Sequence, residues 1–254
     1  MGALVLLLLI PLGMITGVLS DRLQRRNEAV SDITSSWGRE QNVIGPVLMI
    51  PYQYRFKTIK EVPGKDGKVE KREVEQTAGA WAYFLPDMLS VNGDAETRKL
   101  KRGIYEAAVF RAQVKLSGRF AVPDFAAYKI DVKDVNWKDA MISIAANDLR
   151  GTREALVLDW GGVKRPLLPG SQVPGYTTGA TAVLDDAKPI NAPVEFSIPI
   201  DFNGSEGVYF APFGVQNEVV LKSNWPDPAF RGAFLPIERT IRDNGFDAKW
   251  KVSY

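Results

Sequence analysis

The 254-residue sequence contains no cysteine and no histidine. Without cysteine the chain has no disulfide framework, no thiolate nucleophile and no cysteine-ligated zinc site. Without histidine it has neither a Ser-His-Asp nor a Cys-His catalytic arrangement. Catalysis would need carboxylates, lysine, tyrosine or a bound cofactor. The lack of cysteine suits an oxidising compartment, in which stray thiols are a liability, but it does not fix the compartment.

The sequence also lacks an excess of charge of one sign. It has 32 Lys and Arg against 30 Asp and Glu, a net charge of +2, and the two signs are interspersed. A nucleic-acid-binding protein needs clustered cations that neutralise phosphates, so we predict no nucleic-acid partner. Neither a GxxxxGK[ST] phosphate loop nor a GxGxxG sequence after a strand is found. We expect no cofactor and no metal ion.

The acidic residues do not form a recognisable catalytic pair. A glycosidase-type mechanism needs two carboxylates at a defined separation, and nothing in the sequence spacing selects them. Glu106, Asp201 and Glu238 are instead expected to be solvated or salt-bridged, as most surface carboxylates are. We therefore predict no catalytic residue and a protein that is not an enzyme. A carboxylate-dependent hydrolase is the weaker alternative.

The first twenty residues form a long uncharged run. Residues 2–20 read GALVLLLLIPLGMITGVLS. At 1.5 Å per residue the run spans about 28 Å as a helix, close to the hydrocarbon thickness of a bilayer. A cleaved signal peptide is the rival interpretation, but no basic segment precedes the run and no small-x-small cleavage site follows it. We predict a transmembrane helix over residues 1–20, in contact with membrane lipid.

The charges beside this helix bear on its orientation. Asp21, Arg22, Arg25 and Arg26 follow the apolar run, and no basic residue precedes it. Taken alone, the positive-inside rule would put the main domain in the cytoplasm. Long domains, however, are translocated largely regardless of charge.

A polar helical segment is expected next, over residues 21–40. Ala29, Ile33 and Trp37 recur in it at helical spacing and form a narrow apolar stripe. Such a stripe favours a juxtamembrane stalk that lifts a domain off the membrane, over a helix that binds a partner.

Beyond residue 40 the periodicity changes to two. Apolar and polar residues alternate over residues 108–116, 194–202 and 246–254. Strict alternation indicates strands with one buried and one wet face, which is typical of antiparallel sheets. Turn-forming clusters separate the runs, at 63–68, 91–94, 168–175 and 202–207. We predict an all-β fold, a large antiparallel β-sandwich-like domain over residues 41–254.

Two segments of this domain are less regular. Residues 56–76 are highly charged and indicate a long hairpin, which we interpret as a solvated arm rather than a partner-docking arm. Residues 95–103, AETRKLKRG, are expected to form a short helix or a loop.

The stretch over 223–236, SNWPDPAFRGAFLP, concentrates apolar surface between prolines. The prolines fix the backbone and remove hydrogen-bond donors, so the stretch is expected to be an ordered connection. It either plugs the open end of the sandwich or presents a surface that binds something. The candidate interaction residues are Asn224, Trp225, Pro226, Pro228, Phe230 and Phe234.

Five stretches of the sequence together resemble one bacterial family, the CreD-type inner-membrane proteins, also called Cet or cell-envelope integrity proteins. They are IGPVLMIPY at 44–52, FLPDMLSVNG at 84–93, ETRKLKRGIYEAAVF at 96–110, SNWPDPAFRGAFLP at 223–236 and GFDAKW at 245–250. The resemblance implies a protein of the bacterial inner membrane, with an N-terminal transmembrane helix and a large periplasmic β domain. It also implies a role in envelope integrity, linked to a two-component regulatory system. It implies no catalytic residues. Members usually continue into C-terminal membrane helices, so we interpret this chain as the N-terminal portion of such a protein.

These observations favour a structural or interaction module in the cell envelope, without catalysis. The alternative is a module that binds lipid, glycan or peptide through exposed aromatic side chains. The sequence does not identify the envelope protein or glycan that would be its partner.

Overall fold

The computed structural model describes residues 2–63, 69–149, 155–185 and 188–254, with the backbone alone of 2–12, 62–63 and 69–70. One long helix, α1 (Gly2–Trp37), precedes the strands. The strands of the first half are β1 (Gln41–Pro63), β2 (Val69–Phe84), β3 (Met88–Arg102), β4 (Tyr105–Phe120), β5 (Met141–Ala146), β6 (Val157–Trp160) and β7 (Val163–Pro166). Those of the second half are β8 (Leu168–Pro169), β9 (Gly179–Val183), β10 (Val194–Gly204), β11 (Val208–Phe210), β12 (Gln216–Ser223), β13 (Glu238–Arg242) and β14 (Gly245–Ser253). Three single-turn 3₁₀ helices lie between β4 and β5: Ala126–Tyr128, Val132–Asp134 and Trp137–Asp139.

The described strands form two sheets. One has the order β11-β1-β5-β9-β8, with β2 also paired to β1, and the other has the order β13-β14-β12-β3-β4-β10-β6-β7. Most neighbours are antiparallel, but β12 runs parallel to β3 and β11 runs parallel to β1. The prediction of a mostly β fold is thus confirmed, while the purely antiparallel pairing is wrong at these two places. Parallel neighbours need a long crossover, which local alternation cannot reveal.

The core lies between the two sheets. It joins Leu48 and Ile142 of the first sheet to Leu116 and Ile198 of the second, and all four side chains are fully or almost fully buried. The predicted alternation is confirmed in β10, where residues 196, 198, 200 and 202 are buried and the residues between them are more exposed. Burial of one face of each sheet against the other is what produces the period of two.

The helix α1 covers part of the outer face of the second sheet. Val109 of β4 lies on the face that the sequence pattern assigns to solvent, yet it is 1% exposed. It packs in a separate cluster with Ile33 of α1, and Trp37 of α1 packs against the same cluster. The apolar stripe from which we predicted a stalk therefore packs against β3 and β4 of the same chain.

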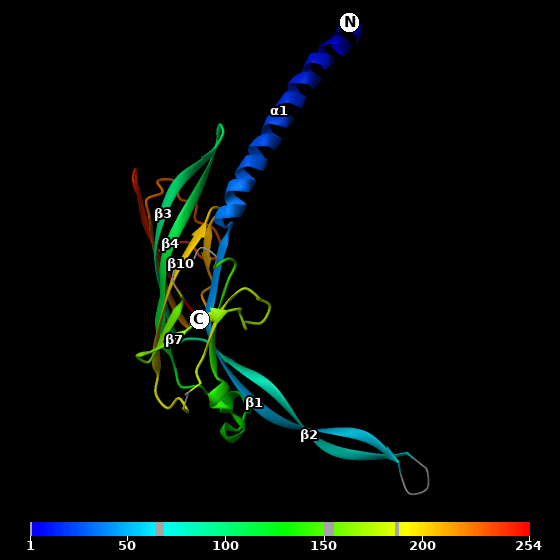
Figure 1. Cartoon of the computed structure of the whole chain (residues 1–254), viewed down its shortest axis with the longest axis vertical. Coiled ribbons are helices and arrows are strands. Elements are labelled where there is room, and N and C mark those ends of the chain that lie inside the picture. Colours follow the sequence, from blue (N-terminus) through cyan, green and yellow to red (C-terminus); the bar gives the residue numbers. More distant parts are fainter. Residues whose placement is uncertain (1, 64–68, 150–154, 186–187) are drawn as a thin grey trace.

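Two long hairpins extend from the sandwich. Residues 95–102 belong to β3 rather than to a short helix or loop, because they pair along their length with β4. The β1–β2 hairpin pairs from Leu48 and Phe84 out to Pro63 and Val69, as the sequence predicted, while its turn at 64–68 lies outside the described residues. Figure 1 shows this arm at the opposite end of the β body from α1.

The prediction of a membrane-spanning helix over 1–20 is not confirmed by the described residues. Among them, no helix contains an apolar stretch of the length and hydropathy needed to cross a bilayer. The described side chains of α1 begin with the uncharged run 13–20, and charged residues follow from Asp21 onward. The earlier part of the predicted segment, residues 1–12, lies outside the described side chains.

Candidate functional site: a cleft at the end of the sandwich

The segment over 223–236 connects β12 to β13, and its first residues are bonded to β3. The Ser223 hydroxyl donates to the carbonyl of Ala95 at 2.7 Å. The Asn224 side chain accepts from the Thr97 backbone N–H at 2.7 Å and from the Thr97 hydroxyl at 2.6 Å, and it donates back to the Thr97 carbonyl at 3.1 Å. These bonds take over where the β3–β12 ladder ends, so the segment leaves the sheet in a fixed direction.

The middle of the segment turns its aromatic side chains toward the core. Trp225 and Phe230 are half-buried and pack against the main core cluster. The Trp225 indole N–H donates to the carbonyl of Asp227 at 2.8 Å. Phe230 meets the rings of Phe246 and Trp250 edge-to-face, with centroids 5.5 and 5.6 Å apart, an arrangement favoured by aromatic quadrupoles.

The end of the segment behaves differently. Phe234 is 44% exposed and its neighbour Leu235 is 63% exposed. Pro226 and Pro228 are half-buried, like the aromatic residues beside them. The structure therefore brings Asn224 to Phe230 together against β3 and β14, and leaves Phe234 at the outer rim.

A cleft of about 370 Å³ opens beneath this segment. A second cleft of about 170 Å³ adjoins it on the side of Phe234. Five residues line both: Val208, Tyr209, Leu221, Arg231 and Trp250. The walls are mostly apolar and aromatic, which is the usual character of a site for a small organic ligand. The segment thus closes the end of the sandwich only in part.

Three charged residues lie among these walls. Glu206 and Asp227 line the larger cleft only, whereas Arg231 lines both. Within the described part of the chain, Arg231 has neither a hydrogen bond nor an ion pair. An exposed guanidinium at the meeting point of two apolar clefts can take a carboxylate or phosphate in bidentate fashion.

Sequence reasoning missed the opposite wall of the cleft. Glu206 lies within the predicted turn at 202–207, and Val208 and Tyr209 follow it. The parallel pairing of β11 with β1 fixes Val208 and Tyr209 in the wall of the cleft that Trp225 also lines. The turn signal FNGSEG was visible, but it carries no information about which distant segment lies across from it.

The acidic residues considered for catalysis do not meet. Asp201 of β10 forms a bidentate ion pair with Arg111 of β4. Glu106 is bonded to Lys101 at 2.8 Å, and this contact lowers the pKa of the Glu106 carboxyl below its usual value. Glu238 is exposed on β13, and none of the three lines the cleft. Across the described residues no group of three or more acidic side chains is placed to hold a metal ion.

Comparison with known proteins decides the family. The family described as "Inner membrane protein CreD" matches residues 1–254 of this chain. The chain belongs to the CreD family. Inner membrane protein CreD of Escherichia coli (strain K12) is 27% identical over 250 residues, which are 98% of this chain and 53% of that protein. The chain thus spans about half the length of this CreD relative, and the similarity points to the bacterial inner membrane.

Solved structures add no further argument to the CreD assignment. An M1 zinc metallopeptidase mutant from Deinococcus radiodurans, with a bound peptide substrate, has a TM-score of 0.30 at 7% identity and covers 65% of this chain and 38% of its own. A second structure of that peptidase has a TM-score of 0.27 at 9% identity, with the same coverage. Similarity at this level establishes neither fold nor activity.

Proposed function

We propose that this chain is a membrane-anchored, periplasmic interaction domain of a CreD-family inner membrane protein and contributes to cell-envelope integrity without catalysis. The observation that carries the proposal is the exposed apolar surface of α1. Met14, Ile15, Val18 and Leu19 are each 55–69% exposed, and they continue the uncharged run of residues 2–20. Surface of this kind is stable in hydrocarbon and unfavourable in water.

The arrangement of α1 and the sheets supports an anchored domain. Figure 1 shows α1 projecting from the β body as one unbroken helix, with its N-terminus at the far end. The C-terminal turns of the helix pack on β3 and β4 through Ile33 and Trp37. An apolar segment at the N-terminus of α1 would therefore hold the sandwich at a set distance from the membrane. The acidic residues are dispersed over several strands, so we propose no reaction.

The side of the membrane is tested with one introduced cysteine. Because the natural chain has no cysteine, Ile59→Cys gives a single thiol, at a site that is 68% exposed on the β1–β2 arm. We expect a membrane-impermeant maleimide to label this variant in intact spheroplasts to the same extent as in detergent-lysed cells. Labelling only after lysis would place the domain in the cytoplasm and refute the proposal. The cysteine-free parent chain is the matched control.

A second candidate function is favoured by Arg231, which lines both clefts and has no ion pair with any residue that the structure describes. The apolar walls suit an acyl chain and the guanidinium suits an anionic head group, so the clefts fit an amphiphile such as a fatty acid. Glu206 and Asp227 line the larger cleft only and would repel an anion there, which favours Arg231 as the position of the head group. This favours a lipid-like ligand over a glycan or a peptide.

Removal of the Arg231 charge should weaken such binding. With a doxyl-labelled stearic acid as quencher of Trp225 and Trp250, we expect Arg231→Gln to raise the half-saturating concentration about tenfold, the value of one charge-assisted hydrogen bond. Arg239→Gln is the control, because Arg239 is exposed on β13 and does not line either cleft. Equal half-saturation in the two variants would contradict the ligand site.

A further inference from the structure

We propose that the tip of the β3–β4 hairpin is a second membrane contact, in which Ile104 enters the head-group region of an anionic phospholipid surface and the neighbouring cations bind its phosphates. The inference rests on the proposed anchor, because the anchor brings that surface within reach. It adds an interaction surface that the anchor alone does not require.

The tip presents an apolar side chain to solvent. The strands pair up to Arg102 and Tyr105, which leaves Gly103 and Ile104 as the turn. Ile104 is 88% exposed, the highest value among the large hydrophobic residues of the described chain. Isoleucine is uncommon in a solvent-exposed hairpin turn, because turns favour Gly, Asn, Asp and Ser. An isoleucine there suits a turn that is covered by something apolar.

The residues just behind the turn are basic. Arg98, Lys99, Lys101 and Arg102 lie within five positions of β3, with Glu96 and Glu106 nearby. Lys101 is ion-paired with Glu106 and Arg102 with Asp32, whereas Lys99 has no ion pair among the described residues. On α1, Asp21 follows the apolar run and is ion-paired with Arg25 at 3.0 Å, and Arg22 and Arg26 lie beside this pair. Each lysine or arginine close to an anionic bilayer increases binding about fivefold, and the attraction fades within one Debye length. A basic collar around an apolar tip is complementary to anionic lipid.

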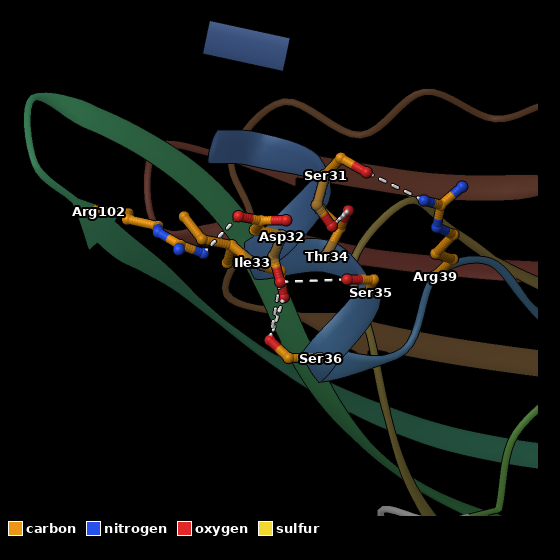
Figure 2. Close-up of polar contacts among 8 residues, drawn as sticks. All are labelled: Ser31, Asp32, Ile33, Thr34, Ser35, Ser36, Arg39 and Arg102. Atoms are coloured by element: carbon orange, nitrogen blue, oxygen red, sulfur yellow. Dashed lines mark hydrogen bonds and ion pairs between the residues drawn. The ribbon is translucent and has the colours of Figure 1, made fainter. Parts of the chain in front are cut away.

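The tip is held in one direction relative to α1. Arg102 forms an ion pair with Asp32 at 2.7 Å, and Figure 2 shows this contact joining the hairpin to the last turns of the helix. The Arg98 guanidinium lies 4.5 Å from the centre of the Trp37 ring. The Trp37 indole N–H donates to the carbonyl of Phe110 at 3.1 Å. These contacts join the end of the helix and the hairpin into one packed unit.

This unit aims the tip toward the proposed membrane. Figure 1 shows the β3–β4 tip pointing the same way as the N-terminal part of α1 and reaching to the height of the middle of the helix. The middle of α1 is where the uncharged run ends, at Asp21. The tip and the end of the apolar run therefore lie at a similar level. With the apolar run of α1 in the bilayer, as proposed, the lipid head groups lie at this level.

The contact is tested with the full chain in lipid nanodiscs. The variant Ile104→Cys carries an environment-sensitive fluorophore on its one thiol, in nanodiscs of phosphatidylcholine alone or with phosphatidylglycerol added. We expect a blue-shifted emission and protection from an aqueous quencher only with phosphatidylglycerol, and loss of both in high salt. Reversal of two cations by Lys99→Glu with Lys101→Glu should abolish the shift. Lys60→Glu with Lys71→Glu on the distant arm makes the same change in net charge and should leave it intact.

The outcomes separate the two proposals. A second probe at Ile15→Cys, in the apolar part of α1, reports on insertion of the anchor. If the Ile15 probe is in hydrocarbon and the Ile104 emission is the same in both lipids, the tip contact is refuted and the anchor stands. If the Ile15 probe is in water, both the anchor and the tip contact are refuted. A shift that survives the Lys99 and Lys101 reversal would also refute the tip contact as described.

Discussion

Replacement of Gly245 by alanine is expected to destabilise the domain by on the order of 3 kcal/mol, and to lower its melting temperature by about 10 °C. Gly245 begins β14 with φ of +140°. A Cβ at this position would lie 2.1 Å from the carbonyl oxygen of Ser223 and 2.8 Å from the Cα of Asn224. Both obstacles are backbone atoms, so the clash can be relieved only by moving the chain at the start of the candidate segment.

The expected damage from Gly245→Ala therefore extends to the cleft. Displacement of Ser223 and Asn224 would break their bonds to Ala95 and Thr97, and Trp225 would follow. Thermal unfolding of the full chain, followed by tryptophan fluorescence, measures the loss of stability. Quenching by doxyl-stearic acid measures the damage to the cleft.

A matched glycine separates the clash from backbone strain. Gly232 lies in the same segment with φ of +112°, but a Cβ there meets no atom within 4 Å. Gly232→Ala should therefore cost only the conformational strain of about 1 kcal/mol. Equal melting temperatures of the two alanine variants would contradict the prediction that the close approach of Gly245 to Ser223 limits the stability of the domain.

Truncation of Phe202 to alanine is expected to cost about 3–5 kcal/mol, because a large side chain is removed from the middle of the core. Phe202 is 1% exposed on β10 and lies opposite Ala112 of β4 in the register of the sheet. Ala112 cannot fill the volume that the phenyl ring leaves, because its side chain is small and its backbone is held in β4. Thermal unfolding of the full chain should show a fall of about 10 °C or more in melting temperature.

The control for Phe202→Ala lies on the same strand. Glu195 points to the exposed face of β10, so Glu195→Ala should change stability by no more than about 0.5 kcal/mol. If Phe202→Ala had the same melting temperature as Glu195→Ala, the two sheets would not share this core.

The candidate segment shows how far local reasoning can go. Its prolines and aromatic residues correctly indicated an ordered, apolar connection, and its first half does pack against the core. The sequence offered a core plug and a binding surface as alternatives, and the structure has features of both. Trp225 and Phe230 cover the end of the sandwich, yet two clefts stay open beneath them. Tyr209 and Arg231, which come from different parts of the chain, line both clefts.

The role of α1 illustrates the same limit. The spacing of Ile33 and Trp37 predicted one apolar face of a helix. The sequence did not predict which surface this face contacts. That surface is Val109 and its neighbours, whose side of β4 reads as solvent-facing in a strictly alternating strand. Only the docking of the helix explains why both faces of β4 are buried at that point.

By itself, the sequence determined the features that depend on residues close together in the chain. The missing cysteine and histidine removed whole classes of chemistry, the period of two identified the strands, and the uncharged run at the N-terminus identified a candidate anchor. The tertiary structure alone decided the parallel pairings of β3 with β12 and β1 with β11, the docking of α1, and the placement of Arg231 and Tyr209 on the walls of the same clefts. Those contacts join residues far apart in the chain, and they are selected by the burial of whole sheet faces, which no local pattern records.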